Sequence, residues 1–281
     1  MSTDASTEQE ALANPRRTSR RAAVRRYATS AVKGLAGLVV MVGLWELLRR
    51  LDVLPRSAVP STAATLTALR AGLFGGDLLS ATGHTLLAWA AGLGLASLIG
   101  LPLGFALGLS RWADAATREV VDFLRPIPSV AFVPVALVFL GFGLKMEVVL
   151  VLIGAVWPIV FNTRYGVQDV DPKLVESGQS LHYSDWTIVR RIKLVAATPA
   201  ILTGLRTASA IALILTVSAE TLAVPEGLGN VISQSATTGS TADAYAAIVI
   251  TGFLGVVMNM AIATVRTRLV PWSTRAGDRE V

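Results

Sequence analysis

The sequence predicts an all-α membrane protein with about six transmembrane helices. Of its 281 residues, 53% are hydrophobic and only 16% are charged, a balance typical of a chain that crosses the bilayer several times. The apolar stretches are continuous runs of roughly twenty residues, the length at which a helix crosses the hydrocarbon core. A transmembrane β-barrel would show alternating apolar and polar residues instead, so the runs predict a bundle of helices.

The composition also excludes several classes of function. The chain has no Cys, which rules out disulfides, thiolate metal sites and Cys nucleophiles. Its two His, His84 and His182, lie far apart in the sequence, and we therefore expect no metal site. The net charge of +6 does not indicate nucleic-acid binding, because the cations flank apolar segments and only 6% of residues are aromatic.

The N-terminal part predicts a tail, a span and a loop. Residues 1–30 are polar and rich in Arg, and we expect them to form a disordered basic cytoplasmic tail. A first transmembrane helix is expected at residues 31–50, because no small-residue cleavage site of an export signal follows the apolar run. Residues 51–83 contain Pro and Gly breaks, and they predict an external loop with a short amphipathic helix capped by Ser61.

The remaining apolar runs lie within residues 80–266 and predict one membrane domain. We expect its five spans at about 84–109, 129–144, 146–165, 199–220 and 244–265. Residues 110–128 are expected to be a loop with a short polar helix, and residues 267–281 a second cytoplasmic tail.

Small residues repeat every fourth position in two of these spans. Such stripes let membrane helices approach closely. The second stripe continues into Glu220, which we therefore expect to face protein or water and not lipid, as a candidate functional carboxylate. The first stripe predicts helix packing through Gly92, Ala96, Gly100, Gly104 and Gly108.

Residues 171–195 interrupt the apolar sequence with a charged, helix-forming insert. Asp171 can cap a helix, and Pro172 fits the first turn, where a missing N–H is tolerated. A second helix start follows at Ser184, after a break at His182 and Tyr183. The insert is thus predicted to form an elbow of two short helices.

The distribution of Lys and Arg sets the expected orientation. With the N-terminus inside, the inner segments hold seven cations up to the first span, three at 110–128, six around the insert and four at the C-terminus. Only five of the 25 Lys and Arg remain outside. By the positive-inside rule, both termini and the elbow are cytoplasmic.

The elbow resembles a known motif, the EAA coupling loop of the permease subunits of type I ABC importers. That motif runs Glu-Ala-Ala, then Gly, then Ile and Leu-Pro at set distances. Glu176, Ser177 and Gly178 match its opening, and Ile192 and Leu194 match its later apolar positions. The chain departs from the motif at two places, where His182 replaces a Gly and Val195 replaces a Pro. His is among the residues enriched at positive φ, so the turn can form with some strain.

The resemblance extends over about residues 35–272 and is most specific at 124–134, LRPIPSVAFVP. This phrase is similar to the branch of permeases that serves nitrate, sulfonates and taurine. Two further departures are Ala88, where relatives often have Arg, and Leu140, where Trp is common. The family implies a type I importer permease fold in a bacterial inner membrane and a small, anionic solute such as an aliphatic sulfonate, taurine or nitrate.

The family also implies partners. Two permease copies, expected as a homodimer, would form the pathway, two ATP-binding subunits would dock under the elbows, and an extracytoplasmic substrate-binding protein would deliver the solute. The chain lacks a GxxxxGK[ST] phosphate loop. We therefore expect no cofactor here, ATP and magnesium on the partner ATPase, and no enzymatic activity in this chain.

Residue roles follow from this resemblance. We expect ATPase coupling to involve Glu176 foremost, and with it Ser177, Gly178, His182, Ile192 and Leu194. Trp186 is expected to pack inside the elbow, and Arg190 and Arg191 to anchor it at the membrane surface. Glu46 and His84 are expected to be interfacial without a ligand role. Candidate pathway or gate residues are the polar positions of the later spans: Asn162, Thr163, Thr216, Ser218 and Glu220.

Other functions remain as alternatives. The same class of permease could carry a pyrimidine or an aromatic compound. A gradient-driven secondary transporter would show repeated halves and acidic residues in mid-span, and an intramembrane enzyme would need a paired catalytic constellation. The sequence shows none of these features, so the importer permease is preferred.

Overall fold

The computed structural model describes residues 34, 36–37, 39–51, 55, 58–110, 112–113, 115–116, 123 and 128–270. Within these residues the chain is helical and contains no β-strand, which confirms the predicted all-α class. The expected tail at 1–30 lies outside the described residues, as does most of the expected loop at 110–128. Of the tail expected at 267–281, residues 267–269 belong to the last helix instead, and residues 271–281 lie outside the described residues. Two compact units can be distinguished, residues 1–64 and residues 65–281.

The first unit is organised around a helix described over residues 39–50. Trp45 Nε1 donates to the Pro60 carbonyl oxygen at 3.2 Å, and Thr62 Oγ1 donates to Glu46 Oε2 at 3.0 Å. Glu46 also pairs with Arg50 one turn later, at 3.4 Å. These contacts hold the helix against the segment that follows it, and they give the Glu46 carboxylate both a hydrogen-bond donor and a cation as partners.

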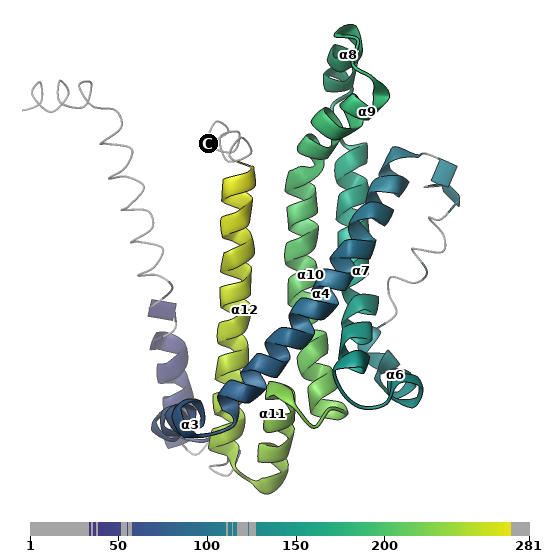
Figure 1. The fold of residues 1–281 in the computed structure, drawn as a ribbon. Helices are drawn as coiled ribbons and strands as arrows, with labels where there is room; N and C mark the ends of the chain where they lie inside the picture. Colours follow the sequence, from purple (N-terminus) through teal and green to yellow (C-terminus); the bar gives the residue numbers. More distant parts are fainter. Residues whose placement is uncertain are drawn as a thin grey trace, which may run out of the picture. The chain divides into compact units, whose positions relative to one another are not determined.

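The second unit contains four helices long and apolar enough to cross a membrane, together with shorter elements (Figure 1). Six spans were expected. The first, at 31–50, is only partly described, and the segment at 129–144 is interrupted, which leaves four long helices among the described residues. The elements run α3 (Thr62–Gly75), α4 (Leu78–Leu109), η1 (Ser129–Phe132), α6 (Val133–Leu140), α7 (Leu144–Gln168), α8 (Pro172–Ser180), α9 (Asp185–Ile188), η2 (Val189–Lys193), α10 (Leu194–Leu222), α11 (Gly227–Thr238) and α12 (Thr241–Leu269).

The small-residue stripe of α4 lies against α7. A side chain at Gly92 would meet Val151, one at Gly100 would meet Ile159, and one at Gly108 would meet Val167. The partner number rises in step with the glycine number, so the two helices run parallel and in constant register. Ala96 lies fully buried in the same seam, and Gly104 faces the backbone of Val160.

Helix α10 packs on α7 in the opposite direction. Gly154 lies against Leu215 in the first half of α7, whereas Gly166 lies against Ala200 near its end. Since α4 and α7 are parallel and α10 is antiparallel to them, the first residues of α4 and α7 lie at the same end as the last residues of α10. The segment between α7 and α10, with α8 and α9, lies at the other end (Figure 1).

The segment expected as a span at 129–144 is not one continuous helix in the described residues. A 3₁₀ turn, Ser129–Phe132, leads into the eight-residue helix α6, and together they form a short apolar helical segment. Twelve residues rise about 18 Å against a hydrocarbon core of about 30 Å. Gly141 and Gly143, both at positive φ, end the segment. The chain still has to return between α4 and α7, because parallel helices start at the same end.

The start of the next expected span also differs. Helix α4 begins at Leu78, six residues before the expected 84, so residues 78–83 belong to the helix and not to the external loop. The short helix expected in that loop is α3, and Ser61 Oγ accepts from the Ala64 N–H at 3.1 Å, as predicted for its cap.

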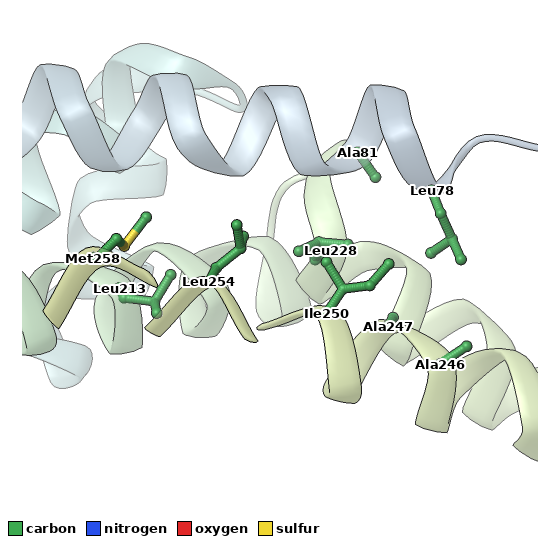
Figure 2. Close-up of a cluster of buried hydrophobic side chains, with 9 residues drawn as sticks. All are labelled: Leu78, Ala81, Leu213, Leu228, Ala246, Ala247, Ile250, Leu254 and Met258. Atoms are coloured by element: carbon green, nitrogen blue, oxygen red, sulfur yellow. The ribbon is translucent and has the colours of Figure 1, made fainter. Parts of the chain in front are cut away.

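A hydrophobic cluster joins α4, α10, α11 and α12 (Figure 2). Leu228 on α11 is completely buried in it, and Leu254 and Met258 of α12 contribute further along the helix. Burial of a side chain of this size stabilises by about 1.5–3 kcal/mol. The cluster therefore holds the short helix α11 against the ends of the long ones.

Candidate functional site

The elbow is built from local capping contacts. Asp171 Oδ1 accepts from the Lys173 N–H at 2.9 Å, which starts α8 with Pro172 in its first turn. Ser184 Oγ accepts from the Thr187 N–H at 3.4 Å, which starts α9. These contacts satisfy backbone donors that a helix start leaves without partners. The predicted turn between two helices is present and α8 is short, but the second helix is not a separate short one, because it runs on into α10.

The turn between the two helices depends on His182. Its φ of 56° is the one positive φ of a non-glycine residue in the described part of the chain. The Tyr183 N–H then donates to the Gly178 carbonyl at 3.1 Å and closes the end of α8. A residue with a Cβ adopts this left-handed conformation at a cost of about 1–2 kcal/mol, so the departure from Gly leaves strain in the turn.

Two of the predicted coupling residues meet inside the elbow. Gly178 is buried, and a Cβ there would lie 2.6 Å from Ile192 Cδ1 and 3.4 Å from Ile188 Cγ1. The absence of a side chain at this position lets α8 lie directly on the second limb. Glu176 and Ser177 are exposed beside it, and Leu194 is 42% exposed.

The outer face of the elbow is apolar. Leu174 is 50% exposed, Leu181 66% and Trp186 72%. The expectation that Trp186 packs inside the elbow is therefore wrong, because the small residue Gly178 already lets the two limbs close. A hollow of about 710 Å³ lies between the elbow and the ends of α4 and α7, and Glu176 and Lys193 are among the residues that line it.

The second limb of the elbow continues into the membrane helix without a break. Residues Asp185–Leu222 form one apolar helical rod, with a π turn at Val189–Lys193. Val195 keeps the backbone N–H that a proline at this position would lack. Displacement of α9 is thus transmitted to α10 by a continuous helix.

A buried polar cluster lies at the opposite end of the bundle from the elbow. It consists of His84 near the start of α4, Glu147 in the first turn of α7 and Glu220 near the end of α10. His84 Nδ1 lies 3.7 Å from Glu220 Oε1 and 3.9 Å from Glu147 Oε1. The helix directions described above place these three ends together.

Glu220 has hydrogen-bond partners that fix its position. Thr85 Oγ1 lies 2.8 Å from Glu220 Oε1, and the Gly229 N–H donates to Oε2 at 2.9 Å. The Leu228 N–H donates in turn to Thr85 Oγ1 at 3.0 Å. The carboxylate therefore holds the first turn of α11, and Gly227 and Gly229 leave the space it occupies. Glu220 is 1% exposed, which confirms that it does not face lipid.

Glu147 differs from Glu220 in lacking such partners. Its side chain is fully buried, and neither carboxylate oxygen has a hydrogen-bond partner among the described residues. Buried polar atoms are almost always hydrogen-bonded. The unmet oxygens of Glu147 face His84, so they belong to the same cluster.

His84 connects the cluster to the surface. Its Nε2 lies 2.9 Å from Glu226 Oε2, on the side away from Glu147 and Glu220. His84 and Glu226 also line a hollow of about 630 Å³ bounded by the starts of α4 and α11. The cluster is thus buried on one side and accessible on the other.

The predicted pathway residues are not gathered into one site. Asn162 Nδ2 donates to the Pro158 carbonyl at 2.8 Å, and the side chain lies against Gly204, toward the elbow half of the bundle. Thr163 and Thr216 are buried, Ser218 is partly exposed, and Glu220 alone belongs to the polar cluster. The two departures from relatives are accommodated by packing, since Ala88 is fully buried and Leu140 lies beside a buried cluster around Met146.

Sequence reasoning missed two of the three cluster residues. His84 was assigned to an interface without a role, and Glu147 was given none. The available signal was that ionisable residues in membrane helices are functional candidates by default, which applies to Glu147 in an apolar segment. Nothing in the sequence relates residue 84 to residues 147 and 220, because their proximity depends on helix directions.

Comparison with known proteins identifies the family of the chain. Residues 96–275 match the family model described as the binding-protein-dependent transport system inner membrane component. The chain belongs to this family. It is therefore a permease subunit of an ABC importer and a multi-pass membrane protein, a component of a transporter and not an enzyme.

Individual relatives agree. The chain is 31% identical to an ABC transporter permease of Methanocaldococcus jannaschii over 82% of this chain and 88% of the relative. It is 25% identical to the aliphatic sulfonates transport permease SsuC of Bacillus subtilis, over 86% and 87% of the two chains. It is 27% identical to the taurine permease TauC of Escherichia coli, over 63% and 64%. These relatives support the predicted sulfonate, taurine and nitrate branch.

The fold agrees with a solved transporter as well. A chain of the MetNI methionine ABC transporter in an inward-facing conformation superposes with a TM-score of 0.61 at 20% identity. The match covers 68% of this chain and 95% of the other. This likeness confirms the type I importer permease fold.

Proposed function

We propose that this permease subunit imports a small organic anion and that residues 171–195 receive the motion of the ATPase. The observation that carries the coupling role is the elbow itself. Its exposed side chains Leu174, Leu181 and Trp186 lie in or between α8 and α9, and exposed apolar patches of this kind are typical of protein interfaces. The second limb is continuous with α10, which gives a rigid connection into the membrane domain.

Glu176 is the proposed polar contact of this interface. Its carboxylate is exposed and lines the hollow beside the elbow, with Lys193 on the facing limb. A partner that inserts a basic or amide side chain into the hollow would find Glu176 at its edge. Ser177, Gly178, His182, Ile192 and Leu194 keep the shape of the elbow around this contact.

The proposed assembly follows the family. Two copies of this chain would form the pathway as a homodimer, two ATP-binding subunits would dock on the two elbows, and a substrate-binding protein would approach the opposite end. The termini would lie on the elbow side, in the cytoplasm of a bacterial cell, as the distribution of Lys and Arg predicts. ATP and magnesium would be bound by the partner subunits.

The proposed solutes are an aliphatic sulfonate, taurine or nitrate. The support is the likeness to sulfonate and taurine permeases. The Glu220 carboxylate is compatible with an anionic solute, because it is buried and bonded to Thr85 and Gly229. A pyrimidine or aromatic solute remains the alternative within the same class.

Coupling can be tested in proteoliposomes that contain this chain, its ATPase and its binding protein. We expect Glu176→Arg to lower solute-stimulated ATP hydrolysis and the amount of ATPase that co-purifies, because the charge is reversed at the contact. Glu176→Gln should have a smaller effect. Asp243→Arg, an exposed carboxylate at the other end of the bundle, is the matched control. Full assembly and full stimulation in Glu176→Arg would disprove the coupling role.

The solute can be tested separately. Sulfonates, taurine, nitrate, pyrimidines and small aromatic acids should be compared by the thermal shift they cause in the partner binding protein. The shifting compound should then be accumulated by the proteoliposomes. A binding protein that responds to pyrimidines alone would overturn the proposed solute class and leave the permease assignment unaffected.

A further inference from the structure

The buried cluster of His84, Glu147 and Glu220 brings one imidazole nitrogen and two carboxylates close together. We propose that it is a binding site for one divalent transition-metal ion of the zinc type. The proposal does not depend on the transported solute or on the coupling role of the elbow. It rests on the distances between the three donor atoms, on the Glu147 oxygens that have no hydrogen-bond partner among the described residues, and on the contact of His84 Nε2 with Glu226.

The first argument is geometric. One ligand atom from each residue lies within 4.8 Å of the other two, with His84 Nδ1 at 3.7 Å from Glu220 and 3.9 Å from Glu147. Atoms spaced in this way lie about 2.2–2.5 Å from a common central point, and zinc bonds to His and carboxylate ligands are about 2.0–2.2 Å. Shifts of a few tenths of an ångström would complete the site. These separations are too long for hydrogen bonds.

The second argument is electrostatic. Glu147 is fully buried, and its two oxygens have no hydrogen-bond partner in the described part of the chain. Glu220 is also buried, so two carboxylates share one enclosed space with the imidazole. Buried charges are normally paired or bind metals. An ion with two positive charges would neutralise both carboxylates and supply the partner that Glu147 lacks.

The third argument concerns the tautomer of His84. Nε2 lies 2.9 Å from Glu226 Oε2, so the proton of a neutral imidazole is held there as an N–H donor. The lone pair of Nδ1 then faces Glu147 and Glu220. Metal-binding His side chains commonly donate their other N–H to a carboxylate, which orients the ring. Glu226 would have this orienting role and would not touch the metal.

Access and coordination number are also suitable. The hollow of about 630 Å³ beside His84 and Glu226 gives a path to the cluster from the surface. Three protein ligands with a water molecule in the fourth position are a common arrangement for zinc. The expectation of no metal site was based on the distance between the two His. Here one His is joined by carboxylates from two other helices.

An ion at this place would have a structural consequence. Its ligands come from α4, α7 and α10, at the end of the bundle opposite the elbow. The ion would therefore hold these three helix ends together. The gain in stability should appear as a rise in the melting temperature with ion concentration, since a ligand that binds only the folded state stabilises it.

The test uses the full chain in lipid nanodiscs, freed of metal with a chelator and titrated with Zn²⁺. We expect one Zn²⁺ per chain and a raised melting temperature. In His84→Gln and Glu147→Gln, affinity should fall by more than about 100-fold, because loss of an outer-shell partner alone costs about 10–100-fold. In Glu226→Gln, the affinity for Zn²⁺ should fall by about 10–100-fold. His182→Gln, which alters the other His of the chain, should bind Zn²⁺ like the wild type.

Further measurements protect the test from variants that fail to fold. Glu147→His retains a metal donor and should keep Zn²⁺ binding. Co²⁺ added to the wild type should give the visible absorption of a site with nitrogen and oxygen ligands. The proposal is overturned if the folded wild type binds no Zn²⁺ or Co²⁺, or if His84→Gln binds Zn²⁺ as tightly as the wild type. It is also overturned if Glu147→Gln is stabilised by Zn²⁺ as much as the wild type, which would show that Glu147 is not a ligand of the ion.

Discussion

The two ends of the bundle are built in opposite ways. The elbow at residues 171–195 is exposed, and its contacts join residues close in sequence, as in the caps by Asp171 and Ser184. The cluster at the other end is buried, and its contacts join Thr85 to Glu220 across 135 positions and to Leu228 across 143. Local contacts depend on sequence neighbours, whereas the cluster depends on the packing of all the helices that meet there.

This difference predicts how each end responds to substitution. A change in the elbow should alter docking of a partner and leave the bundle folded. A change in the cluster should alter the stability of the bundle, because buried polar groups that lose partners remain in a dry environment. The following substitutions test that contrast.

The largest effect is expected for Gly229→Val. A Cβ at Gly229 would overlap the Val217 carbonyl oxygen and lie 2.7 Å from Glu220 Cβ. Helix α11 would have to move, and Glu220 would lose the Gly229 N–H. Overpacking and a buried carboxylate without its partner together cost about 3–5 kcal/mol. The expected result is a sharp fall in the melting temperature, measured by size-exclusion chromatography of heated samples.

Gly252→Val on α12 is the control for this prediction, since nothing lies within 4 Å of a Cβ there. It should melt close to the wild type. Equal stability of Gly229→Val and Gly252→Val would show that α11 is not held by Glu220.

A smaller effect is expected for Gly104→Val in the stripe between α4 and α7. A Cβ at Gly104 would lie 2.6 Å from the Val160 carbonyl oxygen and 2.8 Å from Thr163 Cβ. The helices would separate locally, at a cost of about 1–3 kcal/mol. Gly94→Val, on the same helix with open space around it, should show little loss in the same melting assay. Similar losses in both variants would contradict the packing role of the stripe.

At the elbow, Gly178→Leu should separate stability from coupling. The side chain would push Ile192 away and open the angle between the limbs, but the obstructing atom is the flexible end of a side chain. We expect a loss of about 1 kcal/mol in stability and a clear fall in solute-stimulated ATP hydrolysis. Gly178→Ala should lie between this variant and the wild type. Full solute-stimulated ATP hydrolysis in Gly178→Leu would show that coupling does not require α8 to lie directly on the second limb.

The smallest effect is expected for His182→Gly, and it has the opposite sign. Relief of the positive φ of His182 should raise stability by about 0.5–1 kcal/mol, after allowance for the larger chain entropy of glycine. His182→Ala should bring no such gain, because alanine also carries a Cβ. A melting temperature of His182→Gly below that of His182→Ala would contradict the strain at this turn.

Much of the elbow could be predicted because its signals lie within a few residues. Asp171, Pro172 and Ser184 are helix-start residues, and the match at Glu176 and Gly178 identified the family. Trp186 was misplaced because apolarity alone does not distinguish a packed side chain from one that faces a partner. The interruption of the segment at 129–144 could not be predicted for a similar reason, since an apolar run gives no information on where Gly141 and the 3₁₀ turn end a helix.

By itself, the sequence determined the helical membrane class, the family, the elbow and the stripe of small residues, because each depends on periodicity or on neighbouring residues. Tertiary structure alone decided that α4 and α7 run parallel in register and that α10 runs against them. Those directions bring His84, Glu147 and Glu220 together from three helices. Helix periodicity specifies which face of a helix is packed, but only the packed bundle specifies which ends meet.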